Sequence, residues 1–352
     1  MSVEDRVREL AAEVRSPDET AVERARERHL TLLKPPGSLG VLEELGVRLS
    51  GMAGEVPPPM PESPGVVVCA GDHGVLERGV SPWPKEVTAA MVKNFCAGGA
   101  AANVLAKTVG ATMSVLDVGV AAELERYPLL RTAKVRPGTD DLTRGPAMSR
   151  EDAARAVLSG GGIAGELVES GTDLLVTGDM GIGNTTPAAA LISAFIGRPP
   201  REVTGRGTGI DDRTFELKVG VVEEALKLHE PDPGDPLGAL AALGGLEHAA
   251  IVGLLLMGAV YGVPVVLDGV VSNSAALVAC SLAPNCAGYL IAGHLSTEPG
   301  AKVALEYLGL EPVLNLRMRL GEGTGGLLAV PVAQAAARVL NEMMTMEGAG
   351  IG

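Results

Sequence analysis

The sequence predicts an α/β protein built on a doubly wound, mostly parallel sheet. Apolar runs with strand character alternate along the chain with helical patterns, an order typical of parallel sheets with helices between the strands. These runs are short and lack polar alternation, as expected for strands covered by helices on both faces. The chain has 352 residues, 46% of them hydrophobic, which is enough for a large core. The expected strands are residues 66–70, 113–118, 174–177, 263–267, 289–292 and 313–320.

Helical patterns occupy both ends of the chain. Residues 1–56 carry apolar side chains at helical spacing, interrupted by a proline- and glycine-rich break at residues 34–40. A proline-rich link then leads into the first strand, and a long Ala/Leu/Val helix, roughly residues 327–344, follows the last one. We therefore expect a small helical domain formed by residues 1–60 and 326–352, and a large α/β catalytic domain over residues 61–325.

The composition argues against nucleic-acid and membrane partners. The net charge is -14 and only 2% of the residues are aromatic, whereas nucleic-acid binding needs a basic face or aromatic side chains for stacking. One uncharged run, residues 249–267, contains glycines and a proline, which favours a buried helix and strand over a membrane span. The four cysteines lack zinc-site spacing, and the charged N-terminus lacks a signal-peptide pattern. We expect a cytoplasmic protein.

Four glycine-rich loops follow expected strands or precede helices, at residues 71–74, 178–187, 205–209 and 321–326. Backbone N–H groups in such loops bind phosphate, helped by the dipole of the following helix. None of the loops ends in the Gly-Lys-Ser/Thr of a P-loop. A Gly-x-Gly-x-x-Gly match at residues 321–326 leaves only 26 residues after it, too few for a dinucleotide-binding unit. Together the loops predict one phosphate held mainly by the backbone, with no metal site.

Glu322 is the candidate catalytic base. Glycines enclose it at the carboxyl end of the last expected strand, where open α/β sheets bind their ligands. The alternative is an acidic turn residue beside a helix N-terminus. Asp179, in the loop after another strand, is a second carboxylate near the expected phosphate. His73 and His294 also follow strand ends and could act as acid or base, although we favour hydrogen-bonded structural roles for both.

Short motifs run in order along almost the whole chain. They are Lys34-Pro-Pro-Gly-Ser-Leu-Gly, Gly71-Asp-His-Gly-Val, Gly79-Val-Ser, Gly178-Asp-Met-Gly-Ile-Gly-Asn-Thr-Thr, Gly205-Arg-Gly-Thr-Gly, Leu267-Asp-Gly and Gly321-Glu-Gly-Thr-Gly. In identity and order this set resembles the nicotinate-nucleotide–dimethylbenzimidazole phosphoribosyltransferase family. Several of the motifs are long enough to be specific.

The resemblance implies an enzyme of cobalamin biosynthesis that moves ribose 5-phosphate from nicotinate mononucleotide to a nitrogen of 5,6-dimethylbenzimidazole. The products would be α-ribazole 5′-phosphate and nicotinate, with inversion at C1′ because the substrate is β and the product α. The resemblance further implies a Rossmann-like fold, a small helical domain made from both chain ends, a homodimer and no cofactor.

The same resemblance assigns roles to individual residues. Glu322 matches the general base, and Asp179 a secondary carboxylate. Asn184 and Asp268 are expected beside the ribose or the nicotinate. The expected phosphate site consists of Gly181, Gly183, Gly207, Gly209, Lys218 and Ser296, and the expected walls of the base pocket are Ser81, Met180 and Leu320.

Two positions depart from the family pattern and leave the acceptor base open. The family commonly has Glu at the position of Asp179, and Gln after Val87-Thr88, where this chain has Ala90. One alternative is therefore the same transfer to another aromatic base, such as a purine, a phenol or another benzimidazole. Others are a non-catalytic mononucleotide-binding protein and a nicotinamide-dependent dehydrogenase.

Overall fold

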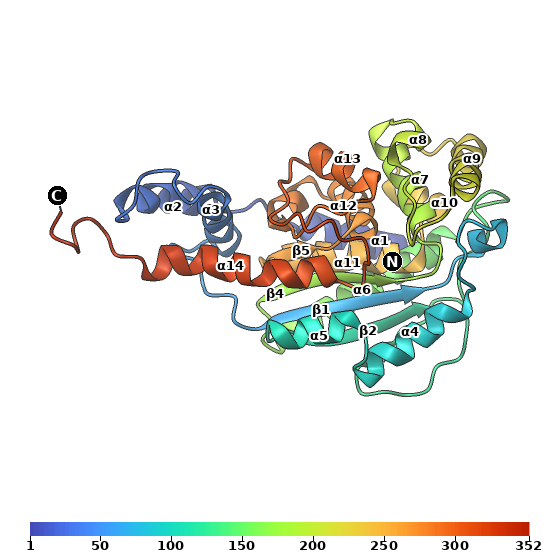
Figure 1. Ribbon diagram of the computed structural model, residues 1–352, viewed down its shortest axis with the longest axis horizontal. Helices are drawn as coiled ribbons and strands as arrows, with labels where there is room; N and C mark the ends of the chain where they lie inside the picture. The colour runs from blue at the N-terminus through green and yellow to red at the C-terminus, as the bar shows by residue number, and fades with distance from the viewer. Residues whose placement is uncertain (352) are drawn as a thin grey trace.

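The computed structural model describes residues 1–351 and contains a six-stranded sheet in which all neighbouring strands are parallel (Figure 1). The strand order is β3-β2-β1-β4-β5-β6. The strands are β1 (Pro64–Gly71), β2 (Thr112–Gly119), β3 (Leu130–Thr132), β4 (Leu174–Met180), β5 (Val265–Leu267) and β6 (Leu290–Ala292). The predicted α/β, doubly wound fold is confirmed.

The centre of the sheet is buried because β1 and β4 consist mainly of apolar and small residues. Every residue of both strands is buried. From β1 the chain builds outwards through β2 to β3, and it then starts again at β4 on the other side of β1. This reversal creates a switch point between β1 and β4, and open α/β sheets bind their ligands beside such a point, outside the carboxyl ends of the strands.

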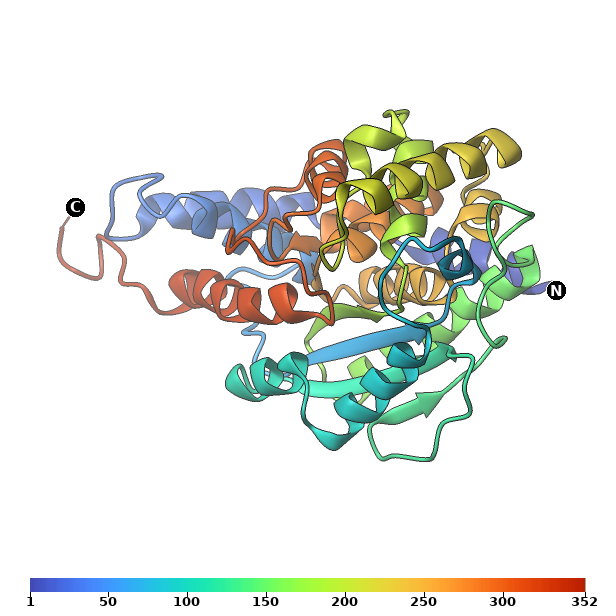
Figure 2. The same ribbon diagram turned by 45° about the vertical axis from the view of Figure 1, so that its right-hand side comes forward.

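Helices cover both faces of the sheet (Figures 1 and 2). α4 (Glu86–Ala97), α5 (Ala101–Thr108) and α14 (Thr324–Glu342) pack on one face, and α6 (Arg150–Glu169) and α11 (Leu246–Tyr261) on the other. α11 contains most of the uncharged run, and 13 of its 16 residues are buried in the protein core. Within residues 1–351, no helix is long and apolar enough to cross a membrane.

Two further helices begin at the carboxyl edge of the sheet. α7 (Thr185–Ile196) follows β4, and α12 (Val270–Leu282) follows β5, so the N-termini of both helices lie beside the switch point. The remaining α-helices are α1 (Val3–Glu13), α2 (Glu19–Thr31), α3 (Val41–Ala53), α8 (Pro200–Val203), α9 (Asp212–His229), α10 (Pro236–Leu243) and α13 (Pro299–Leu308). Two 3₁₀ helices are η1 (Gly74–Arg78) and η2 (Pro284–Tyr289).

The two chain ends meet in a helical layer formed by α2, α3 and α14 (Figure 1). A separate apolar cluster of Ala25, Leu32, Val47 and Leu340 joins these helices, and Arg28 Nε donates a 2.6 Å hydrogen bond to the carbonyl oxygen of Leu340. α1 packs elsewhere, against α6 and α11. The division into domains at residues 60 and 325 stays a prediction, with α1 lying against the α/β body.

The expected strand at residues 313–320 is wrong. The segment makes one β-bridge, between His294 and Leu314, and three backbone hydrogen bonds to residues 292–297, which do not form a continuous ladder over residues 313–320. Leu316 and Leu320 are 54% and 57% exposed, and Arg317 has a φ of 56°, which no strand permits. Val313 and Leu314 pack against the edge of the core, whereas the side chains of Leu316 and Leu320 do not enter it. Strand β3 was not predicted, because it has only three residues and two of them are exposed.

Candidate active site

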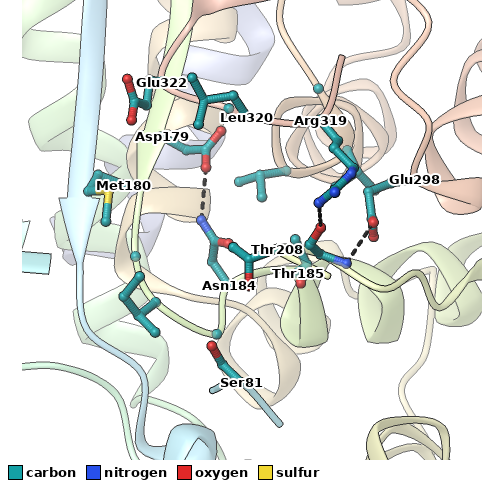
Figure 3. Close-up of a pocket in the computed structure, with 18 of the residues that line it drawn as sticks. Ser81, Asp179, Met180, Asn184, Thr185, Thr208, Glu298, Arg319, Leu320 and Glu322 are labelled. Atoms are coloured by element: carbon teal, nitrogen blue, oxygen red, sulfur yellow. Dashed lines mark hydrogen bonds between the residues drawn. The ribbon is translucent and has the colours of Figure 1, made fainter. Parts of the chain in front are cut away.

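A cavity of about 840 Å³ opens at the carboxyl edge of the sheet, beside the switch point. Its walls come from residues 80–91, 179–185, 206–218, 269–271, 294–298 and 318–322, and Figure 3 shows many of the side chains. The predicted site residues that line it are Ser81, Asp179, Met180, Gly181, Gly183, Asn184, Gly207, Lys218, Ser296, Leu320 and Glu322. Two others, Gly209 and Asp268, are not among the residues that line the cavity.

Glu322 lies in a turn with unusual backbone conformation. Gly321, Glu322 and Gly323 have φ angles of 83°, 63° and 85°, in a region that glycine adopts freely and glutamate rarely. The Glu322 side chain is 6% exposed, and its Oε2 has no hydrogen-bond partner among the described residues. Burial raises the pKa of this carboxyl, the backbone N–H of Ala102 opposes the rise, and the charge of Asp268 adds to it. A raised pKa suits a group that accepts a proton near neutral pH.

Asp268, which follows β5, lies in contact with the backbone of that turn. It is 1% exposed and accepts hydrogen bonds from the backbone N–H groups of Gly323, Gly325 and Gly326 at 3.0, 2.7 and 3.2 Å. His294 Nε2 lies 3.4 Å from the same carboxylate. The Asp268 side chain therefore points toward the first turn of α14 and binds its backbone N–H groups.

Asp179, the penultimate residue of β4, is buried beside Glu322. Its Oδ2 accepts a 2.8 Å hydrogen bond from Asn184 Nδ2 (Figure 3). Burial, and next the charge of Asp268, raise the pKa of Asp179 well above its ordinary value, and the Asn184 bond opposes them. This environment favours the protonated form, in which the acid donates a hydrogen bond.

The opposite side of the cavity carries positive charge and backbone donors. Lys218 on α9 is 2% exposed and donates to Thr185 Oγ1 at 2.7 Å and to the carbonyl oxygen of Gly205 at 3.1 Å. Burial lowers the pKa of Lys218 to about 8, against the charge of Glu298. Because an ammonium has three donors, one N–H of Lys218 stays available to an anion beside the N-terminus of α7.

Glu298 and Arg319 are cavity residues that were not predicted from the sequence. Glu298 Oε1 accepts a 2.7 Å hydrogen bond from the N–H of Gly207, and Arg319 donates to the carbonyl oxygen of the same glycine (Figure 3). Together they hold the glycine-rich turn that contains Gly207 and Gly209, both at positive φ. The only signals in the sequence were their positions, two residues after Ser296 and three before Glu322.

Much of the cavity wall is apolar. The apolar side chains that line it include Val80, Trp83, Val87, Met91, Met180, Ile182 and Leu320, and Leu320 lies beside Asp179 and Glu322, away from Ser81 (Figure 3). Trp83 is 51% exposed and Leu320 57%. Ala90 is exposed and does not line the cavity, so its neighbours Val87 and Met91 shape the wall there. Trp83 was not predicted as a site residue, although the only tryptophan of the chain, two residues after the predicted site residue Ser81, is a usable signal.

His73 is part of a buried network behind the cavity. Its Nε2 lies 2.7 Å from Glu247 Oε1, and His248 Nδ1 lies 2.9 Å from the same oxygen. These three are the only side chains within residues 1–351 grouped closely enough to share a metal ion, but the distances are those of hydrogen bonds. A Cβ on Gly181 would lie 3.0 Å from His73 Nε2. The network therefore supports the turn after β4, and His73 is hydrogen-bonded as expected.

Comparison with known proteins agrees with this architecture. A phosphoribosyltransferase family model matches residues 14–351. The nicotinate-nucleotide–dimethylbenzimidazole phosphoribosyltransferase of Salinispora tropica is 55% identical, over 95% of this chain and 96% of the relative, and that of Chloroflexus aggregans is 51% identical, over 95% and 94%. The crystal structure of the Thermus thermophilus enzyme of the same name superposes with a TM-score of 0.90 at 47% identity, covering 95% of this chain and 99% of that one. The chain belongs to the nicotinate-nucleotide–dimethylbenzimidazole phosphoribosyltransferase family.

Proposed function

We propose that this protein transfers ribose 5-phosphate from nicotinate mononucleotide to 5,6-dimethylbenzimidazole, giving α-ribazole 5′-phosphate and nicotinate for cobalamin biosynthesis. The observation that carries the proposal is one cavity with three parts. A cationic, glycine-rich side suits a phosphate, an apolar side suits an aromatic ring, and two buried carboxyl groups, those of Asp179 and Glu322, line the same space.

The phosphate binds at the cationic side of the cavity. Gly181 and Gly183 would offer backbone N–H groups there, with Gly207, Ser296 and the charged Lys218 beside them, and the N-terminus of α7 favours an anion. Gly209 contributes through the shape of its turn, at a φ of 107°. Asn184, which is bonded to Asp179, would lie beside the ribose or the nicotinate.

The benzimidazole binds at the apolar side of the cavity. Met180 and Leu320 would cover its faces, and Ser81 would offer a polar contact at one edge. This lining favours a flat, apolar acceptor over a purine, whose several polar edge atoms would each need a partner. A competition between dimethylbenzimidazole, adenine and a phenol for the same donor tests this preference, and faster use of adenine or the phenol would contradict it.

The reaction is a single displacement at C1′. One benzimidazole nitrogen forms the new bond, while the bond between C1′ and the cationic nicotinate ring breaks and its electron pair returns to the ring nitrogen. Attack opposite the leaving group inverts C1′. The proton on the second benzimidazole nitrogen passes to Glu322, which burial prepares as a base. Asp179 is the secondary carboxylate. No cofactor takes part in these steps.

The decisive experiment replaces the base. Glu322→Gln keeps the shape and hydrogen-bonding capacity of the side chain but cannot accept the proton, so turnover falls about 10²- to 10⁴-fold while binding of nicotinate mononucleotide is retained. Nicotinate release measures turnover, and calorimetry measures binding. Glu306→Gln, an exposed position on α13, serves as the control. A non-catalytic mononucleotide-binding protein would instead release no nicotinate in either variant or in the unchanged protein.

We further propose a homodimer in the cytoplasm. Apolar side chains are exposed where the chain ends meet, among them Leu30 (62%), Leu33 (40%), Met344 (59%) and Met346 (37%). They lie side by side, because the N–H of Leu33 donates to the carbonyl oxygen of Met344 and that of Met346 to Thr31. Such a patch favours a second copy of the chain as its partner. All four cysteines carry free thiols, which suits a reducing compartment.

A further inference from the structure

The turn that carries Glu322 needs a source of stabilisation. Three consecutive residues, 321–323, have positive φ, and for the glutamate this conformation is unfavourable. The turn also begins α14, whose first N–H groups have no partner within the helix. Gly323, at the N-cap position of α14, has no side chain that could supply one.

Asp268 supplies the missing partner from a different part of the chain. Its Oδ2 accepts from the N–H of Gly323, and its Oδ1 accepts from those of Gly325 and Gly326. Hydrogen bonds to a charged acceptor are stronger than neutral ones, and the helix N-terminus favours a negative charge. The C-terminal end of the left-handed turn is therefore held at Gly323 and at the first residues of α14.

Asp268 is itself held in place. Its own N–H donates to Thr177 Oγ1 at 3.1 Å, which ties the residue to β4. His294 lies 3.4 Å from its Oδ1, and the His294 ring packs so closely on Gly325 that any side chain at that glycine would overlap with the ring. The carboxylate is 1% exposed and is not among the groups that line the cavity.

We infer that Asp268 is a positioning residue, which holds Glu322 in its left-handed turn and keeps a negative charge behind it, rather than a ligand of the ribose or nicotinate. This inference rests on the proposed function, because it gives Glu322 its role as the base. It differs from the expectation that the family resemblance suggested for Asp268.

Asp268 has a second effect on Glu322, because its negative charge raises the pKa of the Glu322 carboxyl group. Around Glu322 lie Asp179 from β4, Asp268 after β5 and the N–H of Ala102 at the start of α5, and His294 after β6 lies against Asp268. Burial raises the pKa of Glu322, the N–H of Ala102 lowers it, and the charge of Asp268 raises it again. Removal of the Asp268 charge should therefore make Glu322 a weaker base.

The test is Asp268→Asn, which keeps one acceptor oxygen and the side-chain shape but removes the charge. We expect kcat to fall about 10- to 100-fold, as for a small displacement of a catalytic group. The Michaelis constant for nicotinate mononucleotide should change less than about twofold, and the acidic limb of the kcat profile should move to lower pH. A tenfold rise in that Michaelis constant with an unmoved acidic limb, or no change at all, would overturn the inference.

Two further variants separate positioning from misfolding. In a Glu322→Gln background, Asp268→Asn should lower the residual turnover little further, whereas loss of a substrate ligand would lower it again. If Asp268→Asn does not fold, Thr177→Val removes the anchor of Asp268 without touching the cavity. That variant should lower kcat and leave the Michaelis constant unchanged, and a raised Michaelis constant would contradict positioning.

A measurement without substrate separates this inference from the proposed function. The titration of Glu322 in the ligand-free protein is identified by infrared difference spectroscopy against Glu322→Gln. Asp268→Asn should move this titration to lower pH even if no turnover of nicotinate mononucleotide is found, in which case only the proposed function fails. An unchanged titration would overturn the charge effect.

Discussion

At the scale of single residues, burial shifts the pKa values on the two sides of the cavity in opposite directions. Burial raises the pKa of the Asp179 and Glu322 carboxyl groups and lowers the pKa of the Lys218 ammonium group. The carboxyls become better suited to hold a proton, and the lysine becomes easier to neutralise. The pH range in which the site works is therefore bounded by two shifted pKa values. The raised pKa of Glu322 sets the acidic limit, and the lowered pKa of Lys218 sets the alkaline limit.

Lys218 predicts a loss of phosphate affinity at alkaline pH. Its pKa in the free protein is about 8, and a bound phosphate dianion stabilises the charged form, so affinity is full below pH 8 and falls as the pH rises above it. The dissociation constant for nicotinate mononucleotide, measured by calorimetry between pH 7 and 9.5, should rise by up to about tenfold per pH unit above 8. Lys218→Met should bind more weakly, with a flat profile. A flat profile in the unchanged protein would contradict the role of Lys218.

At the scale of secondary structure elements, the site depends on how closely α6 and α11 cross. A Cβ on Gly160 would overlap with the carbonyl oxygen of Ala250, and one on Gly253 would overlap with that of Val157. The helix backbones therefore touch, and this contact sets the position of α11. The first turn of α11 carries Glu247, which supports His73 and the turn after β4.

Gly253→Ala should strongly destabilise the protein. The added methyl has no space, because its neighbours are backbone atoms that cannot rotate away. We expect the free energy of unfolding to fall by about 3 kcal/mol, at the upper end of overpacking effects, measured by urea denaturation. Gly162→Ala in α6 is the matched control, since nothing lies within 4 Å of its added Cβ. That variant should be neutral or up to about 1 kcal/mol more stable, and equal effects of both would contradict the close crossing.

At the scale of the whole molecule, the two chain ends form one layer with an exposed apolar patch. α14 connects this layer to the site, since it begins beside Glu322 and ends against α2 and α3. If a second copy of the chain covers the patch, then assembly and the catalytic turn are joined by a single helix. The oligomeric state and the activity should therefore be measured on the same variants.

The double substitution Leu30→Glu and Leu33→Glu should separate the proposed dimer into monomers. Two charges in an apolar interface cannot be paired across a symmetric contact, so association is lost. Sedimentation should report one chain mass for the variant and two for the unchanged protein. Val104→Glu on α5, an exposed apolar residue outside the patch (60% exposed), is the control and should stay dimeric. An unchanged mass for the double variant would place the interface elsewhere.

Much of this protein is determined by local signals in its sequence. Unalternated apolar runs such as the one in β1 identify buried parallel strands, and glycine-rich turns after them mark the ligand edge of the sheet. Those signals predicted the fold, and they directed attention to Glu322 and the turn after β4. The same reasoning failed at residues 313–320, because Met318 and Leu320, which line the cavity, follow the core residues Val313 and Leu314 and extend the apolar run beyond them.

Only the tertiary structure decided which groups surround each carboxylate. Asp268 and Gly323 are 55 residues apart in the chain, and Glu298 and Gly207 are 91 apart. Their hydrogen bonds exist because the β-strand crossovers bring separate loops to one edge of the sheet. Spacing and periodicity act over a few residues, whereas the environment of a buried charge depends on every segment packed around it. The residue types at the site could therefore be predicted from the sequence, whereas the charges and hydrogen bonds around them could not.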